Sequence, residues 1–275
     1  MLTLIKAHAF GNDFLLLDES TLTTGIDRAV LARRTCDRHR GLGADGLIFF
    51  RLGGFAAPAA GAVRVAMALL NADGSYSEVS GNGVRCLAAW IAHQTDAPVG
   101  ARLQVDTDAG AKHLELLASD EGGLTFRAAM GHPEDVTAAR LDVDSEAVDV
   151  VTLRVGNPQC VVLGEVTPER LHRLASRLAV HPHFPHGTNV ELATVETTGR
   201  VRILIWERGV GPTEASGTGA CAAAVAAMVH GGARREVDVV SPGGTQRVEW
   251  RDDGLYLTGS AAIIAACQWL VPARA

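Results

Sequence analysis

The chain has 275 residues, of which 47% are hydrophobic, and a formal net charge of −6 at pH 7. This length suits one large or two medium domains. The net charge gives no reason to expect nucleic acid or an anionic membrane surface as a partner. No apolar run is long enough to predict a transmembrane span, and the N-terminus lacks a signal-peptide pattern. The cysteines are odd in number and lack CxxC spacing, so we expect reduced thiols in a cytoplasmic protein, without disulfides or zinc.

The first part of the chain alternates strands with helices. We expect one helix over residues 26–38 and another directly after Ser80. The Gly-, Ala- and Pro-rich segment 53–61 is predicted to be a loop, and the polar segment 119–123 marks a break between domains. Apolar or alternating runs predict strands at residues 2–5, 14–17, 47–50, 63–70, 102–107 and 112–117.

The second part repeats this alternation. Thr167-Pro168-Glu169 is a capping signal for a helix over residues 168–178, and another helix is expected after Ser216. Prolines separate the three histidines of the segment 181–187, so these side chains share no helix or strand face and we expect no metal site. Strands are predicted near residues 124–130, 148–155, 200–206, 236–241, 246–250 and 255–258. Because residues 261–270 can return to the first half, we predict domains at 1–121 plus about 262–275 and at 122–261.

Two short stretches organise this pattern. They are Ser80-Gly81-Asn82-Gly83 and Ser216-Gly217-Thr218-Gly219, and each opens a nearly all-apolar run after a carboxylate-rich segment. The first N–H groups of a helix have no intrahelical partner. With the positive end of the helix dipole they can hold a carboxylate or a phosphate. An all-apolar helix belongs inside a domain, so we expect two buried helices whose N-termini face a ligand.

The stretches indicate an internal repeat. Gly11-Asn12 is echoed by Gly156-Asn157, as Ser80 is by Ser216. A single copy is typical of an ordinary glycine turn before a core helix, whereas two copies favour a functional site. Two such domains facing each other across a cleft would present one serine to each side of a ligand. Paired groups on opposite faces of one carbon are the arrangement of two-base racemisation, in which one group removes the α-proton and the other returns a proton.

At this point the sequence resembles the diaminopimelate epimerase family, cofactor-independent enzymes of lysine and cell-wall biosynthesis, over its whole length. The resemblance implies an α/β (α+β) fold of two pseudo-symmetric domains, each a mixed β-sheet wrapped round a central buried helix. It also implies diaminopimelate as substrate, no cofactor and a homodimer. The motifs that carry it are FGNDF at 10–14, GLGADG at 41–46, NADGS at 71–75, GNGVRC at 81–86, GNP at 156–158, GTNV at 187–190, ERGVG at 207–211 and GTGAC at 217–221.

The family implies a role for each matching position. The two acid–base positions are Ser80 and Ser216. Glu207 would bind the substrate amine or stand behind a catalytic base. Side chains binding the amino and carboxylate groups of the substrate, especially at its distal centre, would be Asn12, Asn71, Asn157, Asn189 and Arg208. Backbone N–H groups for the α-carboxylate at the reacting centre would come from Gly81, Asn82, Gly217 and Thr218.

Three positions depart from the family pattern. Ser80 and Ser216 stand where the family has its catalytic cysteines, and Gln159 where it usually has a histidine. An alcohol has a pKa about 7 units above that of a thiol, so an alkoxide costs on the order of 10 kcal/mol more than a thiolate. A helix N-terminus offsets about 1–2 kcal/mol of this difference. The two-serine form is therefore expected to be a slow epimerase unless another base assists, and the candidates are Glu207 and Glu78.

Four interpretations follow from the two serines. They are engineered to hold substrate without turnover, or they are natural and activated by neighbouring groups. Alternatively, the protein acts on another amino acid as a racemase or dehydratase, or it is a non-catalytic homologue that binds an amino acid. The replacement of the histidine as well favours a natural variant, because an engineer has no need to change it.

Overall fold

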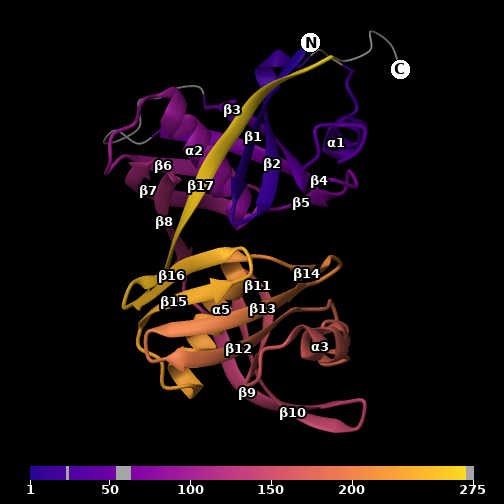
Figure 1. Cartoon of the computed structure of the whole chain (residues 1–275), viewed down its shortest axis with the longest axis vertical. Helices are drawn as coiled ribbons and strands as arrows, with labels where there is room; N and C mark the ends of the chain where they lie inside the picture. The colour runs from indigo at the N-terminus through magenta and orange to yellow at the C-terminus, as the bar shows by residue number, and fades with distance from the viewer. Residues whose placement is uncertain (23–24, 54–62, 271–275) are drawn as a thin grey trace. The chain divides into compact units, whose positions relative to one another are not determined.

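The computed structural model describes residues 1–22, 25–53 and 63–270. Except for Gly53, the predicted loop at 53–61 lies outside these residues. The chain divides into two compact units, one formed by Met1–Ala128 together with the segment from Ser260 onward, the other by Ala129–Gly259 (Figure 1). The sequence-based boundary at 121/122 precedes this division by a few residues. The structural division falls inside β8 (Gly123–Gly131), which continues from the first unit into the second as one strand.

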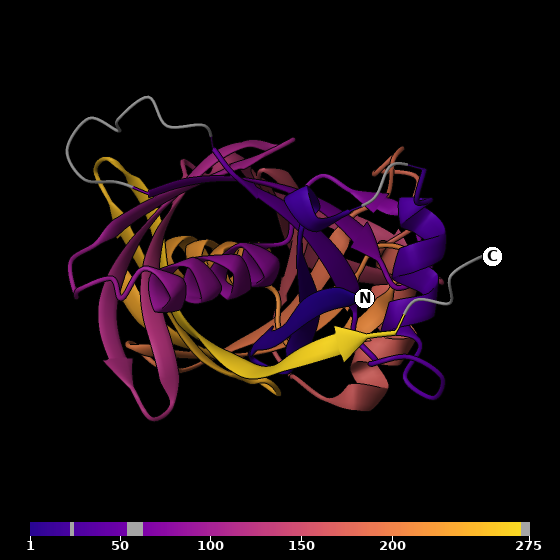
Figure 2. The ribbon, with the colours of Figure 1, turned by 90° about the horizontal axis from the view of Figure 1, so that it is seen from above.

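The first unit surrounds one helix with strands. This helix, α2 (Gly81–Gln94), packs against β1, β2 and β6, and Figure 2 shows the strands curving around it. The other elements of the first unit are β1 (Leu2–Ala9), β2 (Asn12–Asp18), the 3-10 turn η1 (Glu19–Thr21), α1 (Arg28–Cys36), β3 (Gly46–Leu52), β4 (Val63–Asn71), β5 (Tyr76–Ser77), β6 (Arg102–Thr107) and β7 (Gly110–Asp120).

The second unit has the same plan around α5 (Gly217–His230), which packs against β10 to β13 and against β15 and β16. A helical segment covers residues 168–178 as α3 (Pro168–Arg170), the π-helical turn η2 (Leu171–Ala175) and α4 (Ser176–Leu178). The strands are β9 (Glu134–Val143), β10 (Glu146–Val155), β11 (Asn157–Leu163), β12 (Asn189–Thr197), β13 (Arg200–Glu207), β14 (Gly211–Thr213), β15 (Glu236–Ser241), β16 (Gly244–Arg251) and the first part of β17 (Gly254–Trp269).

Strand pairing confirms the predicted internal repeat. In the first unit β1 pairs antiparallel with β2, β2 parallel with β3, β3 antiparallel with β4, and β4 parallel with β6. In the second unit β10, β11, β12, β13 and β15 pair in the same sequence of directions. The turns that open the two series contain Gly11 and Gly156 at φ values of 84° and 76°. A side chain is strained at such positive φ values, which explains why glycine stands at both turns.

The two central helices are largely buried, and α5 is apolar around its circumference. In α5 the residues from Gly219 to Ala227 are all buried, and most are alanine, so neighbouring strands can approach closely. Each helix begins where a serine caps it. Ser80 Oγ accepts a hydrogen bond from the Gly83 N–H at 3.1 Å, and Ser216 Oγ accepts one from the Gly219 N–H at 3.2 Å. The predicted starting points of both helices are therefore confirmed.

Other sequence predictions have mixed outcomes. The helix at 168–178 is confirmed, with Thr167 Oγ1 accepting from the Arg170 N–H at 3.2 Å. The helix predicted at 26–38 is real but shorter, since Asp27 caps it and it ends at Cys36. Strand β9 was not predicted, because its exposed side chains dilute the apolar alternation. Among the described residues, no helix is long and apolar enough to cross a membrane.

The caps give a testable prediction. Replacing Ser80 or Ser216 with Ala removes the acceptor for a helix N–H and should lower the free energy of unfolding by about 1 kcal/mol in each case. Thr at the same positions keeps a hydroxyl acceptor and is the matched control. Urea denaturation measures the effect. Alanine variants as stable as the threonine variants would contradict a capping role.

Candidate functional site

In the first unit, the sequence-predicted residues gather around the N-terminus of α2. Asn82, in the first turn, is buried and donates from Nδ2 to Asn12 Oδ1 at 3.2 Å. The Asn82 Oδ1 atom accepts from the Arg85 guanidinium, which is itself buried. These bonds fix the amide of Asn82 beside Ser80 and connect it to the turn between β1 and β2.

A charged cluster, not predicted from the sequence, holds Asn12 from the other side. Asn12 Nδ2 donates to Asp45 Oδ2 at 2.7 Å, and Arg38 NH2 bonds both Asp45 Oδ1 and Asp13 Oδ1 at 2.7 Å. Lys6 Nζ lies 3.0 Å from Asp13 Oδ2. Burial raises the pKa of Asp13, but hydrogen bonds and charges from Arg38 and Lys6 outweigh burial, so this pKa is lowered. Asp13 therefore stays ionised at neutral pH, and the hydrogen bond to Asp45 keeps the Asn12 amide in one orientation.

Asn71 lies at the same end of this sheet. It closes β4 opposite Gly46, the residue after Asp45, and its Nδ2 donates to Ser75 Oγ at 3.0 Å. The side chain is exposed, as is that of Glu78, one of the two candidate bases. Gly81 has open space where a Cβ would stand, with no heavy atom within 4 Å. The first turn of α2 thus presents its backbone without side-chain cover at that residue.

In the second unit, the corresponding residues gather around the N-terminus of α5. Ser216 is buried, and its Oγ lies 3.5 Å from Thr218 Oγ1 as well as accepting from Gly219. Because the Ser216 oxygen accepts the capping bond, its own proton remains available for donation. Ser216, Gly217 and Thr218 therefore form a turn with a hydroxyl donor beside the first N–H groups of a helix.

Two adjacent strands supply the predicted amides of this unit. Gln159 on β11 pairs in register with Asn189 on β12, and Gln159 Nε2 donates to Asn157 Oδ1 at 2.6 Å. Asn189 Oδ1 accepts from the Arg208 N–H at 2.9 Å. The Arg208 side chain is exposed and bonds His186 O at 2.7 Å. The structure thus brings these four predicted residues together at one end of the neighbouring strands β11, β12 and β13.

A buried carboxyl, not singled out from the sequence, lies on the same face. Glu191 is fully buried on β12, two residues after Asn189 and opposite Ile205. Glu207 follows Ile205 by two residues, and β-strand alternation places it on that face as well. Burial first, and the charge of Glu207 second, raise the pKa of Glu191 well above its usual range. The sequence signal was a lone carboxylate inside the apolar run Val190-Glu191-Leu192.

The thiols are unsuited to replace the serines. Cys86 and Cys221 are fully buried inside α2 and α5, among core residues. Burial raises the pKa of Cys86 to about 12, so this thiol is protonated at neutral pH. Burial, followed by the charge of Glu191, also raises the pKa of Cys160. Both observations are consistent with structural cysteines.

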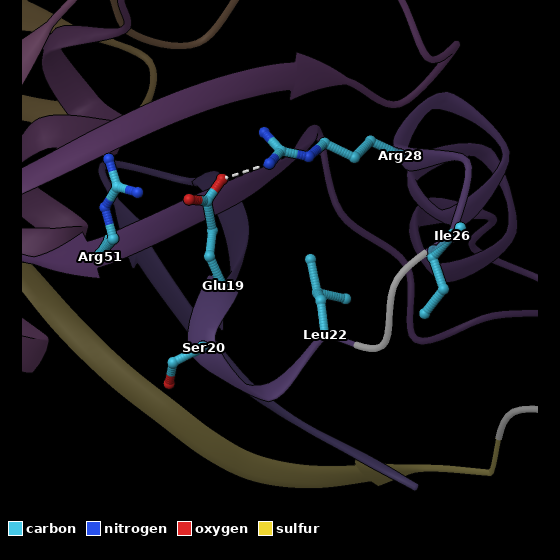
Figure 3. A pocket seen from close by; sticks show the side chains of 7 residues that line it. Glu19, Ser20, Leu22, Ile26, Arg28 and Arg51 are labelled. Carbon is cyan, nitrogen blue, oxygen red and sulfur yellow. Dashed lines mark ion pairs between the residues drawn. The ribbon is translucent and has the colours of Figure 1, made fainter.

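Two surface cavities lie away from the predicted residues. One, of about 390 Å³, is in the first unit, where the Glu19–Arg28 ion pair of 2.8 Å and Arg51 line it (Figure 3). The other, of about 350 Å³, is in the second unit and is lined by both Arg234 and Arg235. Neither cavity is lined by a predicted site residue. The candidate site consists instead of the two half-sites at the N-termini of α2 and α5.

Each half-site combines a serine hydroxyl, the first N–H groups of a helix and several amides. The N–H groups can stabilise negative charge on a carboxylate or on a carbanion next to it. The amides can orient amino and carboxylate groups. Among the described residues, no group of three or more His, Cys, Asp or Glu side chains is placed to hold a metal ion.

Solved structures share this fold at low sequence identity. A predicted epimerase from Pseudomonas aeruginosa matches with a TM-score of 0.72 at 16% identity, covering 99% of this chain and all of the other. A probable proline racemase from Agrobacterium radiobacter matches with a TM-score of 0.70 at 15% identity, covering 99% of this chain and 94% of the other. At such identity the likeness shows the fold alone, a mixed α/β architecture.

Sequence relatives are closer. Diaminopimelate epimerase from Desulforudis audaxviator is 37% identical over 281 residues, which cover 96% of this chain and 98% of the relative. That from Moorella thermoacetica is 38% identical over 275 residues, covering 94% and 95%. The family described as diaminopimelate epimerase matches residues 4–136 and 151–264. The matched residues include the N-termini of both α2 and α5. The chain belongs to the diaminopimelate epimerase family.

Proposed function

We propose that this protein interconverts LL- and meso-diaminopimelate by two-base proton transfer at the α-carbon, without a cofactor. The observation that carries the proposal is the duplicated half-site: each unit of this family member has one serine capping one buried helix at a Gly-rich turn. Two-base chemistry requires such a pair. The amino-acid epimerase names of the relatives support the same reaction class.

The half-sites supply a role for each predicted residue. Ser80 and Ser216 are the acid–base groups, and we infer that they occupy the cysteine positions of the family. The first-turn N–H groups of Gly81, Asn82, Gly217 and Thr218 receive the α-carboxylate and the charge that develops beside it. Polar groups for the second amino-acid head of the substrate come from Asn12, Asn71, Asn157, Asn189 and Arg208. Glu207 binds the substrate amine, and Gln159 holds Asn157 in place.

The serines make the chemical step the slow one. A free alkoxide costs on the order of 10 kcal/mol more than a thiolate. A helix N-terminus recovers only about 1–2 kcal/mol. The alternative function is that of an amino-acid-binding homologue that holds diaminopimelate without turnover. Exchange of the substrate α-hydrogen with solvent deuterium separates the two functions, because a binding protein exchanges nothing.

Replacing both serines with Cys should raise epimerisation by on the order of 10³-fold or more, because most of the difference in proton affinity disappears. Each single replacement should give a site that exchanges the α-proton of one isomer but epimerises slowly. NMR in deuterium oxide, with LL- and meso-diaminopimelate and all four forms, measures both rates. A double variant that binds diaminopimelate yet neither exchanges nor epimerises would show that these serines are not the acid–base pair.

Arg208 offers a test of substrate specificity. Its guanidinium is exposed and can bind a carboxylate bidentately. Arg208→Ala should weaken binding of meso-diaminopimelate by about 2–3 kcal/mol in calorimetry. Arg202→Ala, which removes an exposed Arg that lies on the preceding strand β13 and pairs with Glu196, is the control and should leave the affinity unchanged. Equal affinities in the two variants would remove Arg208 from the binding site.

We further propose that the protein acts as a cytoplasmic homodimer, as the resemblance implies. Light scattering at micromolar concentration should give twice the mass of the 28.8 kDa chain. A stable mass of one chain would contradict the dimer.

A further inference from the structure

Glu191 is a carboxyl group with unused hydrogen-bonding capacity. It is fully buried on β12, and neither carboxylate oxygen has a hydrogen-bond partner anywhere in the described part of the chain. Buried carboxylates are normally paired or protonated, because desolvation of an isolated charge is costly. The charge of Glu207 adds to this cost, and both effects raise the pKa of Glu191. Glu191 therefore stays protonated at pH values where an ordinary Glu side chain is ionised.

Its side chain reaches the turn that Ser216 caps. Glu191 is in register with Val161 on one side and Ile205 on the other, and both belong to the core packed around α5. A Cβ built on Gly219 would stand 2.6 Å from Glu191 Oε1 and 3.2 Å from Ser216 Cβ. The carboxyl and the serine therefore both lie next to the same glycine. The missing side chain at Gly219 is what allows the carboxyl to lie there.

Two further buried polar atoms accompany it. Gln159 Oε1 and Thr213 Oγ1 also lack a hydrogen-bond partner within the described residues. Gln159 is in register with Asn189 on β12, and Thr213 with Ile205 on β13, so the strand ladders bring both to the neighbourhood of Glu191. More than about 90% of buried polar groups in proteins are satisfied. Several unsatisfied ones on neighbouring strands indicate a polar centre that acts when substrate is bound.

We propose that Glu191 is a positioning residue that holds the proton exchanged by Ser216, an inference that rests on the proposed epimerase function. In the abstraction direction the substrate Cα–H bond breaks and its electron pair stays on carbon. The proton passes to Ser216 Oγ while the hydroxyl proton passes to the Glu191 carboxylate. In the return direction the Glu191 acid reprotonates Ser216 as the hydroxyl protonates the carbanion. Ser216 remains a neutral alcohol throughout, so no free alkoxide is needed.

The relay requires a small rearrangement. Ser216 Oγ accepts from the Gly219 N–H and lies near Thr218, so its proton is free to turn toward Glu191. Ser216 and Glu191 are not hydrogen-bonded to each other in the structure. Rotation of either side chain about its own bonds, or one bridging water, must therefore complete the path when substrate binds. In the half-site of Ser80 the buried carboxyl of Asp13 is paired with Arg38 and Lys6, so the relay belongs to one half-site.

The test compares Glu191→Gln, which keeps the shape but cannot relay a proton, with Glu191→Asp, which keeps a carboxyl. Glu214→Gln, an exposed carboxylate two residues before Ser216, is the matched control. Exchange of the α-hydrogen is followed by NMR in deuterium oxide from pH 6 to pH 9 with LL- and meso-diaminopimelate. In Glu191→Gln the exchange rate of one isomer should fall by about 100-fold or more. The exchange rate of the other isomer and the KM should stay unchanged. Glu191→Asp should restore part of the lost exchange.

Other outcomes overturn the inference and identify what failed. If the parent protein exchanges neither isomer, the proposed function fails and the inference with it. If the parent exchanges and Glu191→Gln exchanges both isomers at the parental rate, only the inference fails. If a folded Glu191→Gln variant loses exchange of both isomers equally, Glu191 has a merely structural role.

A second readout needs no activity. A carboxyl whose pKa is raised in the folded state takes up a proton on folding, so its contribution to stability falls as the pH rises above the unfolded value. Relative to the parent, Glu191→Gln should therefore gain stability with increasing pH. The ratio of the two folding constants should rise by up to about tenfold per pH unit. A ratio that is constant from pH 5 to pH 8 would show that Glu191 does not hold the proton.

Discussion

A helix buried on all sides can begin in only a few ways, and this protein uses the same one twice. The first N–H groups of α2 and α5 need partners, and a serine oxygen supplies one partner in each helix. The remaining groups at a Gly-rich turn can accept an anion. The strands of each unit pack against the helix that this cap starts. The cap therefore sets both the packing of the unit and the position of the hydroxyl proposed to do chemistry.

The two half-sites share this backbone arrangement but differ in electrostatics. Around Asn12 the charged groups are paired with one another, and Arg38 contacts both Asp13 and Asp45. Around Asn189 the neighbouring carboxyl is buried and lacks a cation. A paired carboxylate holds an amide in one orientation, whereas burial without a partner raises the pKa of Glu191 and favours its neutral form. An internal repeat of strands and helices thus carries two different environments for proton transfer.

The sequence predicted the backbone better than the buried polar groups. Ser-Gly-x-Gly before an apolar run specifies a helix start by local chemistry alone, and both starts were found. Strand β9 is not evident from the sequence because most of its side chains are exposed, which hides the apolar alternation, although it pairs with the next strand, β10. The environment of Glu191 depends on longer-range pairing. Only the register of β11, β12 and β13 shows that its side chain faces α5 and has no partner.

Strand β17 bears on how the chain folds as it is synthesised. Its first residues pair with β16 in the second unit, and its later ones pair with β1, Leu2 opposite Trp269. Domains usually complete in order from the N-terminus during translation. Here the second unit is contiguous and needs nothing beyond residue 259. Because β1 pairs with the later residues of β17, one side of β1 stays an open sheet edge, in need of protection from other chains, until those residues have been synthesised.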